Sequence, residues 1–189
     1  MKHRAILWST TLLLLVGMLA LLSGCTPQGP APSPVERGKY LVMAGGCSDC
    51  HSPKIFTAQG PVPDTTRLLS GHPADQQLPP LPKGLLGPTQ WGAITTNDLT
   101  AWYGPWGVSF AYNLTPDVKT GIGGWTEELF IQTLRKGKFM GMSRDILPPM
   151  PWQALGGMSD DDLKAIFAYL KSLPPINNPI PAPLPPSNE

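Results

Sequence analysis

Three stretches of the chain carry apolar residues at the spacing of an amphipathic helix: residues 34–43, 126–137 and 159–173. The first has a proline in its first turn, whereas the other two start at Thr126 and Ser159, which suit the N-cap position. Acidic side chains follow both caps, and glycine or proline stands at or after the end of each stretch. The pattern therefore predicts three helices.

The segment between the first two helices, residues 52–113, has a different pattern. It is rich in glycine, proline and aromatic residues, and it lacks a sustained helical spacing. Two short runs, residues 91–96 and 107–112, have the composition of short strands. We expect the rest of this insert to be irregular.

The N-terminus starts with basic residues and continues as an apolar run over residues 5–22, which is the layout of a secretory signal peptide. The run ends at Leu22-Ser23-Gly24-Cys25, which resembles the lipobox of bacterial lipoproteins. In that family the signal is cut before the cysteine and the thiol is acylated. The alternative is a retained transmembrane anchor, because the run is near the lower length limit for a bilayer span. Either way we expect the folded part in the bacterial cell envelope, facing the periplasm or the cell exterior. In the first case lipidated Cys25 holds it to a membrane.

These boundaries divide the chain into four parts: a signal peptide 1–24, a lipidated Pro-rich tether 25–34, a folded domain 35–175 and a Pro-rich tail 176–189. The domain is long enough for one hydrophobic core. The tether and the tail have little apolar surface to bury, so we expect both to be extended. The tail is then either wrapped on the domain or loose.

Charge is nearly balanced, with 14 Lys and Arg residues against 13 Asp and Glu residues. The basic residues form no patch or stripe of the kind that binds phosphate backbones. Nucleic acid is therefore not an expected partner.

The segment with the clearest chemistry is Cys47-Ser48-Asp49-Cys50-His51, a C-x-x-C-H sequence. Two thiols at this spacing can each add to one vinyl group of the same haem, and the next residue then offers an imidazole to the iron. A zinc site is disfavoured, since the only other candidates of these two types are Cys25, His3 and His72. A redox dithiol or a disulfide remains the alternative. The motif predicts one covalent haem c, bound through Cys47 and Cys50 with His51 as the proximal ligand.

A second iron ligand is expected in the sequence Leu147-Pro148-Pro149-Met150-Pro151-Trp152. Three prolines around one methionine keep the backbone out of a helix and remove amide donors, and a thioether is a soft ligand that raises the potential of haem iron. Met150 is therefore the predicted sixth ligand. The alternatives are His72, an open site, or another methionine, namely Met43, Met140, Met142 or Met158.

An N-terminal helix, C-x-x-C-H, a middle helix, a methionine loop and a C-terminal helix together resemble a mono-haem c-type cytochrome of the Met–His class over residues 35–175. Three further sequences resemble the cytochrome domains in subunits of membrane-bound alcohol, aldehyde and gluconate dehydrogenases. Those subunits usually carry three haem domains, whereas this sequence holds one C-x-x-C-H motif. The further sequences are Asn113-Leu-Thr-Pro-Asp117, Thr120-Gly-Ile-Gly-Gly-Trp125 and Met150-Pro-Trp152.

The resemblance implies an all-α cytochrome c fold, with helices wrapped round one covalent haem, a long irregular insert and Pro-rich ends. It implies that the first and third helices cross near Gly38 and Tyr169, with Tyr40 or Tyr169 packed on the crossing. The candidate haem-pocket residues are Asn113, Trp125, Arg135 and Trp152. Ordinary core packing remains the alternative for the two tryptophans, and a surface position at the end of a helix for Arg135.

The expected function is electron transfer to and from redox partner proteins at a membrane surface, without catalysis by this chain alone. Two other functions remain open. One is a haem subunit of a membrane-bound dehydrogenase complex, and the other is a gas-binding or sensor haem protein.

Overall fold

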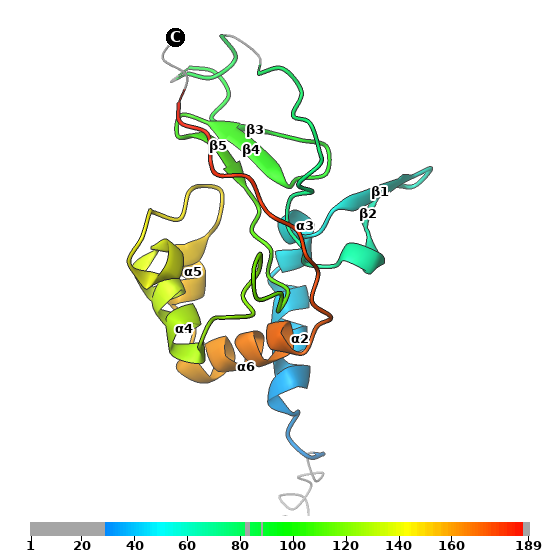
Figure 1. Ribbon diagram of the computed structural model, residues 1–189, viewed down its shortest axis with the longest axis vertical. Coiled ribbons are helices and arrows are strands. Elements are labelled where there is room, and N and C mark those ends of the chain that lie inside the picture. Colours follow the sequence, from blue (N-terminus) through cyan, green and yellow to red (C-terminus); the bar gives the residue numbers. More distant parts are fainter. Residues whose placement is uncertain (1–28, 82–83, 88, 187–189) are drawn as a thin grey trace, which may run out of the picture. The chain divides into compact units, whose positions relative to one another are not determined.

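The computed structural model describes residues 29–81, 84–87 and 89–186, and it divides the chain into two units, Met1–Pro32 and Ser33–Glu189. The predicted signal peptide, the lipidation site Cys25 and the start of the tether lie outside the described residues. In the first unit only residues 29–32 are described, and they have no regular structure. The second unit carries every helix and strand described below (Figure 1).

The three predicted helices are present, and local capping sets where each begins. Helix α2 (Pro34–Ala44) starts with a capping box, in which Ser33 Oγ accepts from the Glu36 amide and the Glu36 carboxylate accepts from the Ser33 amide. Helices α4 (Glu127–Lys136) and α6 (Asp160–Lys171) start at their Thr126 and Ser159 caps. Their side-chain oxygens accept from amides in the first turn of each helix.

Helices α2 and α6 cross in contact, and Figure 1 shows α6 lying across α2. A Cβ atom added to Gly38 would lie 1.8 Å from the carbonyl oxygen of Ala165 and 2.8 Å from Cβ of Tyr169. The expected crossing at Gly38 and Tyr169 is therefore confirmed. Tyr169 is 8% exposed and packs there, whereas Tyr40 is 63% exposed.

Four short helical segments were not predicted from the sequence. They hold too few residues to show a helical period, so their positions depend on tertiary contacts. Two are α-helices and two are 3₁₀-helices: α3 (Cys47–His51), α5 (Trp152–Gly156), η1 (Thr65–Arg67) and η2 (Phe139–Gly141).

The prediction of an all-α fold is wrong. Among the described residues 32% are helical, and 15% are in strand in two small antiparallel sheets. One is a hairpin of β1 (Lys54–Thr57) and β2 (Gly60–Pro63). The other has the order β3-β4-β5, with β3 at Ile94–Thr95, β4 at Ala101–Gly104 and β5 at Gly107–Phe110. The two runs expected to form strands contain β3 and β5, so that part of the prediction is confirmed.

The fold is not all-α because hydrogen bonds between backbone strands order the insert. Strands β4 and β5 pair from Ala101↔Phe110 to Gly104↔Gly107, and Gly107 provides the positive φ of +90° that the turn requires. Strands of two to four residues are too short to show the alternation of side chains from which a strand is predicted. The insert is therefore a structured β region beside the helices.

The Pro-rich tail is wrapped on the domain over residues 176–184. The side chain of Asn178 donates to the carbonyls of Ser70 and His72 at 2.7 and 2.8 Å and accepts from the Ala74 amide at 3.0 Å. Further on, Leu184 and Val108 of β5 exchange two backbone hydrogen bonds. Figure 1 shows this stretch, coloured orange to red, running from the end of α6 to β5.

The hydrophobic core lies between α2, α4 and α6 and extends to loop residues such as Leu69 and Ile122. Each long helix contributes apolar side chains, including Phe130 and Leu134 from α4, whereas Val35, predicted on the apolar face of α2, is exposed. None of the helices in the described part of the chain is both long enough and apolar enough to cross a membrane.

Candidate haem-attachment site

The cysteines and the histidine of the C-x-x-C-H sequence form the single helix α3. Gly46 precedes it with a φ of +64°, a left-handed conformation that favours glycine. Cys47 and Cys50 are three residues apart and therefore lie on one face of the helix. Both are half-buried free thiols, so the structure contains no disulfide between them.

The C-terminal end of α3 is held by Lys54 of β1. Its ammonium group donates to the carbonyls of Ser48, Asp49 and Ser52, at 3.2, 2.7 and 2.7 Å. A cation at this position satisfies carbonyls that lack helical partners and interacts favourably with the helix dipole. Hairpin β1–β2 thereby stabilises the attachment helix.

His51 is buried and its ring has a fixed orientation. Its Nδ1 atom lies 2.7 Å from the carbonyl oxygen of Tyr112, and since a carbonyl only accepts, Nδ1 carries the proton. Burial lowers the pKa of His51, and this outweighs the hydrogen bond to Tyr112, which raises it. The imidazole is therefore neutral, with the Nε2 lone pair available. A neutral ring oriented by its other nitrogen is what iron ligation requires.

Two hydrogen bonds from backbone amides of the insert hold His51 and Ser52. The amide of Gly71 donates to the His51 carbonyl at 2.7 Å, and the amide of Leu69 donates to Ser52 Oγ at 2.9 Å. Residues 69–71 of the insert therefore line α3, and the position of the His51 imidazole depends on the insert as well as on α3.

The thiols do not have the properties of a redox dithiol. Burial raises the pKa of Cys47 and of Cys50 above the ordinary value of a thiol, and Asp49 raises both further. A reactive dithiol needs the opposite shift, because the thiolate is the nucleophile. Nor do the described residues contain a cluster of three or more His, Cys, Asp or Glu side chains that could hold a metal ion. The site fits a covalent haem better than it fits either alternative.

Met150, the predicted sixth ligand, is half-buried and packs against the same core cluster as Cys47. Its loop is tied to the sheet of the insert, since Ser109 Oγ of β5 donates to the Pro148 carbonyl at 2.6 Å. Of the alternative methionines, Met158 also packs on the core, and three are exposed, namely Met43, Met140 and Met142.

His72, the other candidate for the sixth position, is fully buried in the insert. Its Nδ1 is hydrogen-bonded to Thr100 Oγ1 at 2.8 Å, and its ring packs against Phe110 in a tilted arrangement, with centroids 4.8 Å apart. The contacts of His72 that involve its ring are thus with residues of the insert.

The two candidate tryptophans lie in different surroundings. Trp125 packs on the core and belongs to an aromatic cluster with Tyr112 and Phe139, at centroid distances of 6.1 and 5.8 Å. Because the Tyr112 carbonyl orients His51, this cluster reaches the attachment site. Trp152 starts α5, and its indole lies against Gly137, where an added Cβ would be 2.5 Å from the ring.

The two polar candidates both bond to protein groups. The Asn113 amide donates to Thr120 Oγ1 and the Ile176 carbonyl, and it accepts from the amide and the hydroxyl of Thr115. These four bonds use the full capacity of a buried amide. Arg135 bonds to the Gly156 carbonyl and pairs with Asp160 at 2.5 Å, joining the end of α4 to the start of α6. Asn113 and Arg135 therefore hold loops and helix ends together.

Three further residues at the site were not predicted from the sequence. Tyr112 acts through its backbone carbonyl, which any residue type provides. Ser109 and Lys54 act through side chains, but each reaches a partner whose position depends on the folding of the insert. Only the proximity of Lys54 to the C-x-x-C-H sequence offered a hint, because cations are common at helix C-termini.

No family model matches the chain. Among curated relatives, the cytochrome c subunit of the quinone alcohol dehydrogenase of Gluconobacter oxydans is 38% identical over 82% of this chain and 24% of its own length. The gluconate 2-dehydrogenase cytochrome c subunit of Pantoea cypripedii is 31% identical over 71% of this chain and 22% of its own length. The fructose dehydrogenase cytochrome subunit of Gluconobacter japonicus is 27% identical over 91% of this chain and 28% of its own length.

The C-x-x-C-H sequence on one short helix, with the His51 ring oriented by a backbone carbonyl, has the pattern that haem attachment in c-type cytochromes requires. These three homologues of the chain are cytochrome subunits of dehydrogenases. The chain spans less than a third of the length of each of these three relatives.

Proposed function

We propose that this protein is an electron carrier that holds one haem c through Cys47 and Cys50, with His51 and Met150 as the iron ligands. The observation that carries the proposal is the His51–Tyr112 hydrogen bond of 2.7 Å, which leaves a neutral imidazole with Nε2 free beside two unpaired thiols. The haem would supply a reversible one-electron couple. One haem is proposed because the sequence holds a single C-x-x-C-H motif.

The residues of the chain then have separate tasks. Tyr112 fixes the tautomer and the plane of the imidazole, as acceptors bonded to the far nitrogen of a metal-binding histidine do. Ser109 holds the Pro-rich loop that carries Met150, and Met150 packs against the core with part of its surface. A firmly held thioether favours electron transfer over catalysis, since both axial positions are then occupied by protein.

The proposal includes a location. Cleavage before Cys25 and acylation of its thiol would attach the domain to a membrane of the bacterial cell envelope through a Pro-rich tether. The domain would then face the periplasm or the cell exterior, where redox partner proteins can reach it. Mass spectrometry of the protein extracted from membranes tests this part, and an unmodified Cys25 within an intact N-terminus would contradict it.

Haem attachment is tested by acid–acetone extraction of the purified full-length protein, followed by absorption spectroscopy of both phases. We expect the haem to stay with the protein and to give a low-spin spectrum in both oxidation states. Haem that moves into the solvent would refute covalent attachment. Carbon monoxide binding to the reduced protein would indicate an open axial site, and would favour a gas-binding function over a carrier.

Substitution Met150→Leu tests the sixth ligand. The haem should remain attached, the far-red ferric band of methionine ligation should disappear, and the reduction potential should fall markedly, because the thioether raises it. Met142→Leu is the matched control, since that methionine is exposed and should leave the spectrum and the potential unchanged. An unaltered potential in the Met150 variant would exclude Met150 as a ligand.

A second candidate function is a haem subunit within a membrane-bound dehydrogenase complex. The names of the relatives favour it, since the three described above are cytochrome subunits of dehydrogenases. In that case a catalytic subunit would reduce the haem of this chain. Purification from membranes under mild conditions distinguishes the two functions: a stoichiometric dehydrogenase partner supports the complex, and recovery of this chain alone supports an independent carrier.

A further inference from the structure

A buried polar network in the insert has no role in the function proposed above. It consists of Asp98, Thr100 and His72, all at least nine-tenths buried. Thr100 Oγ1 lies 2.9 Å from Asp98 Oδ2 and 2.8 Å from His72 Nδ1, so the threonine hydroxyl joins the carboxylate to the imidazole. Three adjoining buried polar groups are costly unless they are fully hydrogen-bonded.

The direction of these hydrogen bonds follows from the number of protons. Thr96 Oγ1 donates to Asp98 at 2.6 Å as well. Burial alone raises the pKa of Asp98, but the bonds from Thr96 and Thr100 outweigh it, so the pKa is lowered and the group is a carboxylate. The single proton of Thr100 points to Asp98, and Thr100 Oγ1 therefore accepts from His72 Nδ1. Each hydrogen bond between Asp98, Thr100 and His72 therefore has one direction, from donor to acceptor.

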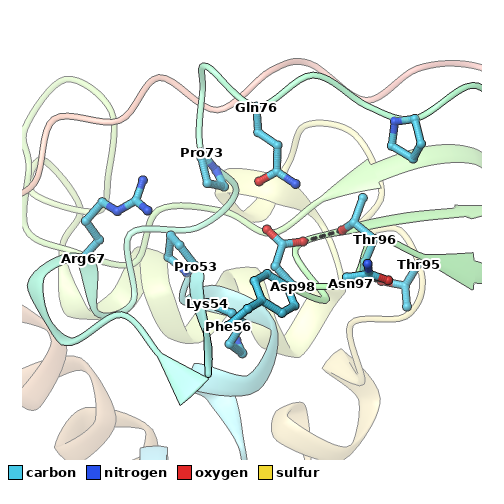
Figure 2. A pocket seen from close by; sticks show the side chains of 11 residues that line it. Pro53, Lys54, Phe56, Arg67, Pro73, Gln76, Thr95, Thr96, Asn97 and Asp98 are labelled. Carbon is cyan, nitrogen blue, oxygen red and sulfur yellow. Dashed lines mark hydrogen bonds between the residues drawn. The ribbon is translucent and has the colours of Figure 1, made fainter. Parts of the chain in front are cut away.

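The ionised end of the network lies at a cavity of about 500 Å³, whereas His72 lies in the interior. Figure 2 shows Asp98 and Thr96 in this cavity, joined by their hydrogen bond, with Pro53 and Lys54 on the opposite side. The hydrogen bonds from Thr96 and Thr100 keep the carboxylate charged. The His72 end of the network connects to the attachment site through the backbone at Ala111, and Lys54 of that site lines the same cavity as Asp98.

Two backbone hydrogen bonds connect the network to the axial ligand. The Ala111 amide donates to the Thr100 carbonyl at 2.8 Å, and the Ala111 carbonyl accepts from the His72 amide at 3.0 Å. Ala111 is thus clamped between the two residues. The next carbonyl along the chain, that of Tyr112, accepts from His51 Nδ1. An added Cβ on Gly71, beside His72, would lie 2.5 Å from the Ala111 oxygen, so the packing on this side is tight.

We infer that Asp98, Thr100 and His72 position the axial imidazole of His51 by fixing the backbone at Ala111 and Tyr112. They are positioning residues, since none of them touches the imidazole in the contacts described above. A displaced Tyr112 carbonyl changes the direction and strength of its bond to Nδ1, and that bond sets the ring plane and the basicity of the ligand. The inference rests on the proposed function, because it requires His51 to bind haem iron.

The test compares three variants of the full-length, haem-loaded protein. Thr100→Val has nearly the shape of threonine but lacks the hydroxyl, so it breaks both bonds of the network. Thr100→Ser keeps the hydroxyl and serves as the rescue. Thr133→Val is the matched control, because it removes a buried hydroxyl whose bond is to the Leu129 carbonyl of its own helix.

Two measurements report the position of the axial ligand. The hyperfine-shifted haem methyl resonances of the ferric protein depend on the plane of the imidazole, and potentiometric titration reports the strength of the Nδ1 hydrogen bond. We expect Thr100→Val to alter the methyl shift pattern and move the potential. Thr100→Ser should restore both, and Thr133→Val should leave both unchanged even where it lowers stability.

Three outcomes overturn the inference: a Thr100→Val protein with the wild-type methyl pattern and potential, a Thr133→Val protein with the same changes, or a Thr100→Ser protein without recovery. If Thr100→Val is not recovered with haem, Asp98→Asn decides, since it replaces the acceptor of the Thr100 hydroxyl and should alter the methyl shift pattern, whereas a wild-type pattern overturns the inference. Absence of covalent haem from the wild-type protein would instead refute the proposed function, so the two failures are distinguishable.

Discussion

Replacing Gly38 by alanine tests the close crossing of α2 and α6. The added Cβ would lie 1.8 Å from the Ala165 carbonyl oxygen and 2.5 Å from its carbonyl carbon. Both are backbone atoms in the middle of α6, so no side-chain rotation can make room. Ordinary contact begins at 3.4 Å, and the two helices would have to separate locally by about 1.6 Å.

The magnitude is the difference of two opposing effects. Overpacking in a well-packed core costs about 1–3 kcal/mol, and this overlap with rigid backbone belongs at the upper end. Alanine in place of glycine within a helix returns about 1 kcal/mol. We therefore expect Gly38→Ala to lower the free energy of unfolding by about 2 kcal/mol, which corresponds to a fall in Tm of about 4–8 °C for a chain of this size.

The assay is urea unfolding of the haem-loaded protein, followed by far-ultraviolet circular dichroism. The midpoint should fall with an unchanged slope, because the same surface becomes exposed. Gly92→Ala is the control, since its added Cβ would meet no atom within 4 Å. A Gly38→Ala protein as stable as the wild type, or more stable, would refute the crossing described here.

Two further predictions concern the loop of Met150 and the acid stability of the insert. Ser109→Ala removes the 2.6 Å hydrogen bond to the Pro148 carbonyl. We expect cyanide to displace the sixth ligand of the ferric protein about fivefold faster, which is equivalent to the ~1 kcal/mol of one hydrogen bond. An unchanged displacement rate, measured by stopped flow, would contradict this. Hydrogen bonds from Thr66 and Arg67 hold the pKa of Asp64 at about 2, below its ordinary value of 3.8. Since the folded-state pKa is the lower one, ionised Asp64 contributes stability that is complete above its ordinary pKa and is lost as the pH falls towards 2. Asp64→Asn should therefore flatten the decline in unfolding free energy over this acid range, and a decline as steep as in the wild type would show that Asp64 is not its source.

The long helices could be predicted because their signals are local. Ser159 and Thr126 cap α6 and α4 at the positions that the sequence indicates, and the acidic residues after each cap mark the same boundary. The crossing at Gly38 could also be predicted, since the family resemblance implied it and a close approach of two helices needs a small residue. The helix boundaries depend on neighbours within a few residues, and the crossing depends on the need for a small residue at the contact.

The sheets could be predicted only in part, because their strands are two to four residues long and one partner of β5, Leu184 of the tail, is distant in the sequence. Strand β5 is paired on one side with β4 and bonded on the other to Leu184 of the tail, and neither partner has a distinctive sequence pattern. The same holds at the attachment site. The side chains of the C-x-x-C-H sequence are evident, whereas the carbonyl that orients His51 belongs to Tyr112, in a segment whose position follows from the folding of the insert.

The wrapped tail has a consequence for how the protein is made. Residues 176–184 are synthesised after every element that they bind, yet Asn178 holds the loop of Ser70 and His72, and Leu184 extends the edge of β5. Until these residues emerge, the insert lacks contacts that fix it beside the attachment helix. A nascent chain therefore holds the insert less firmly beside α3 than the finished protein does.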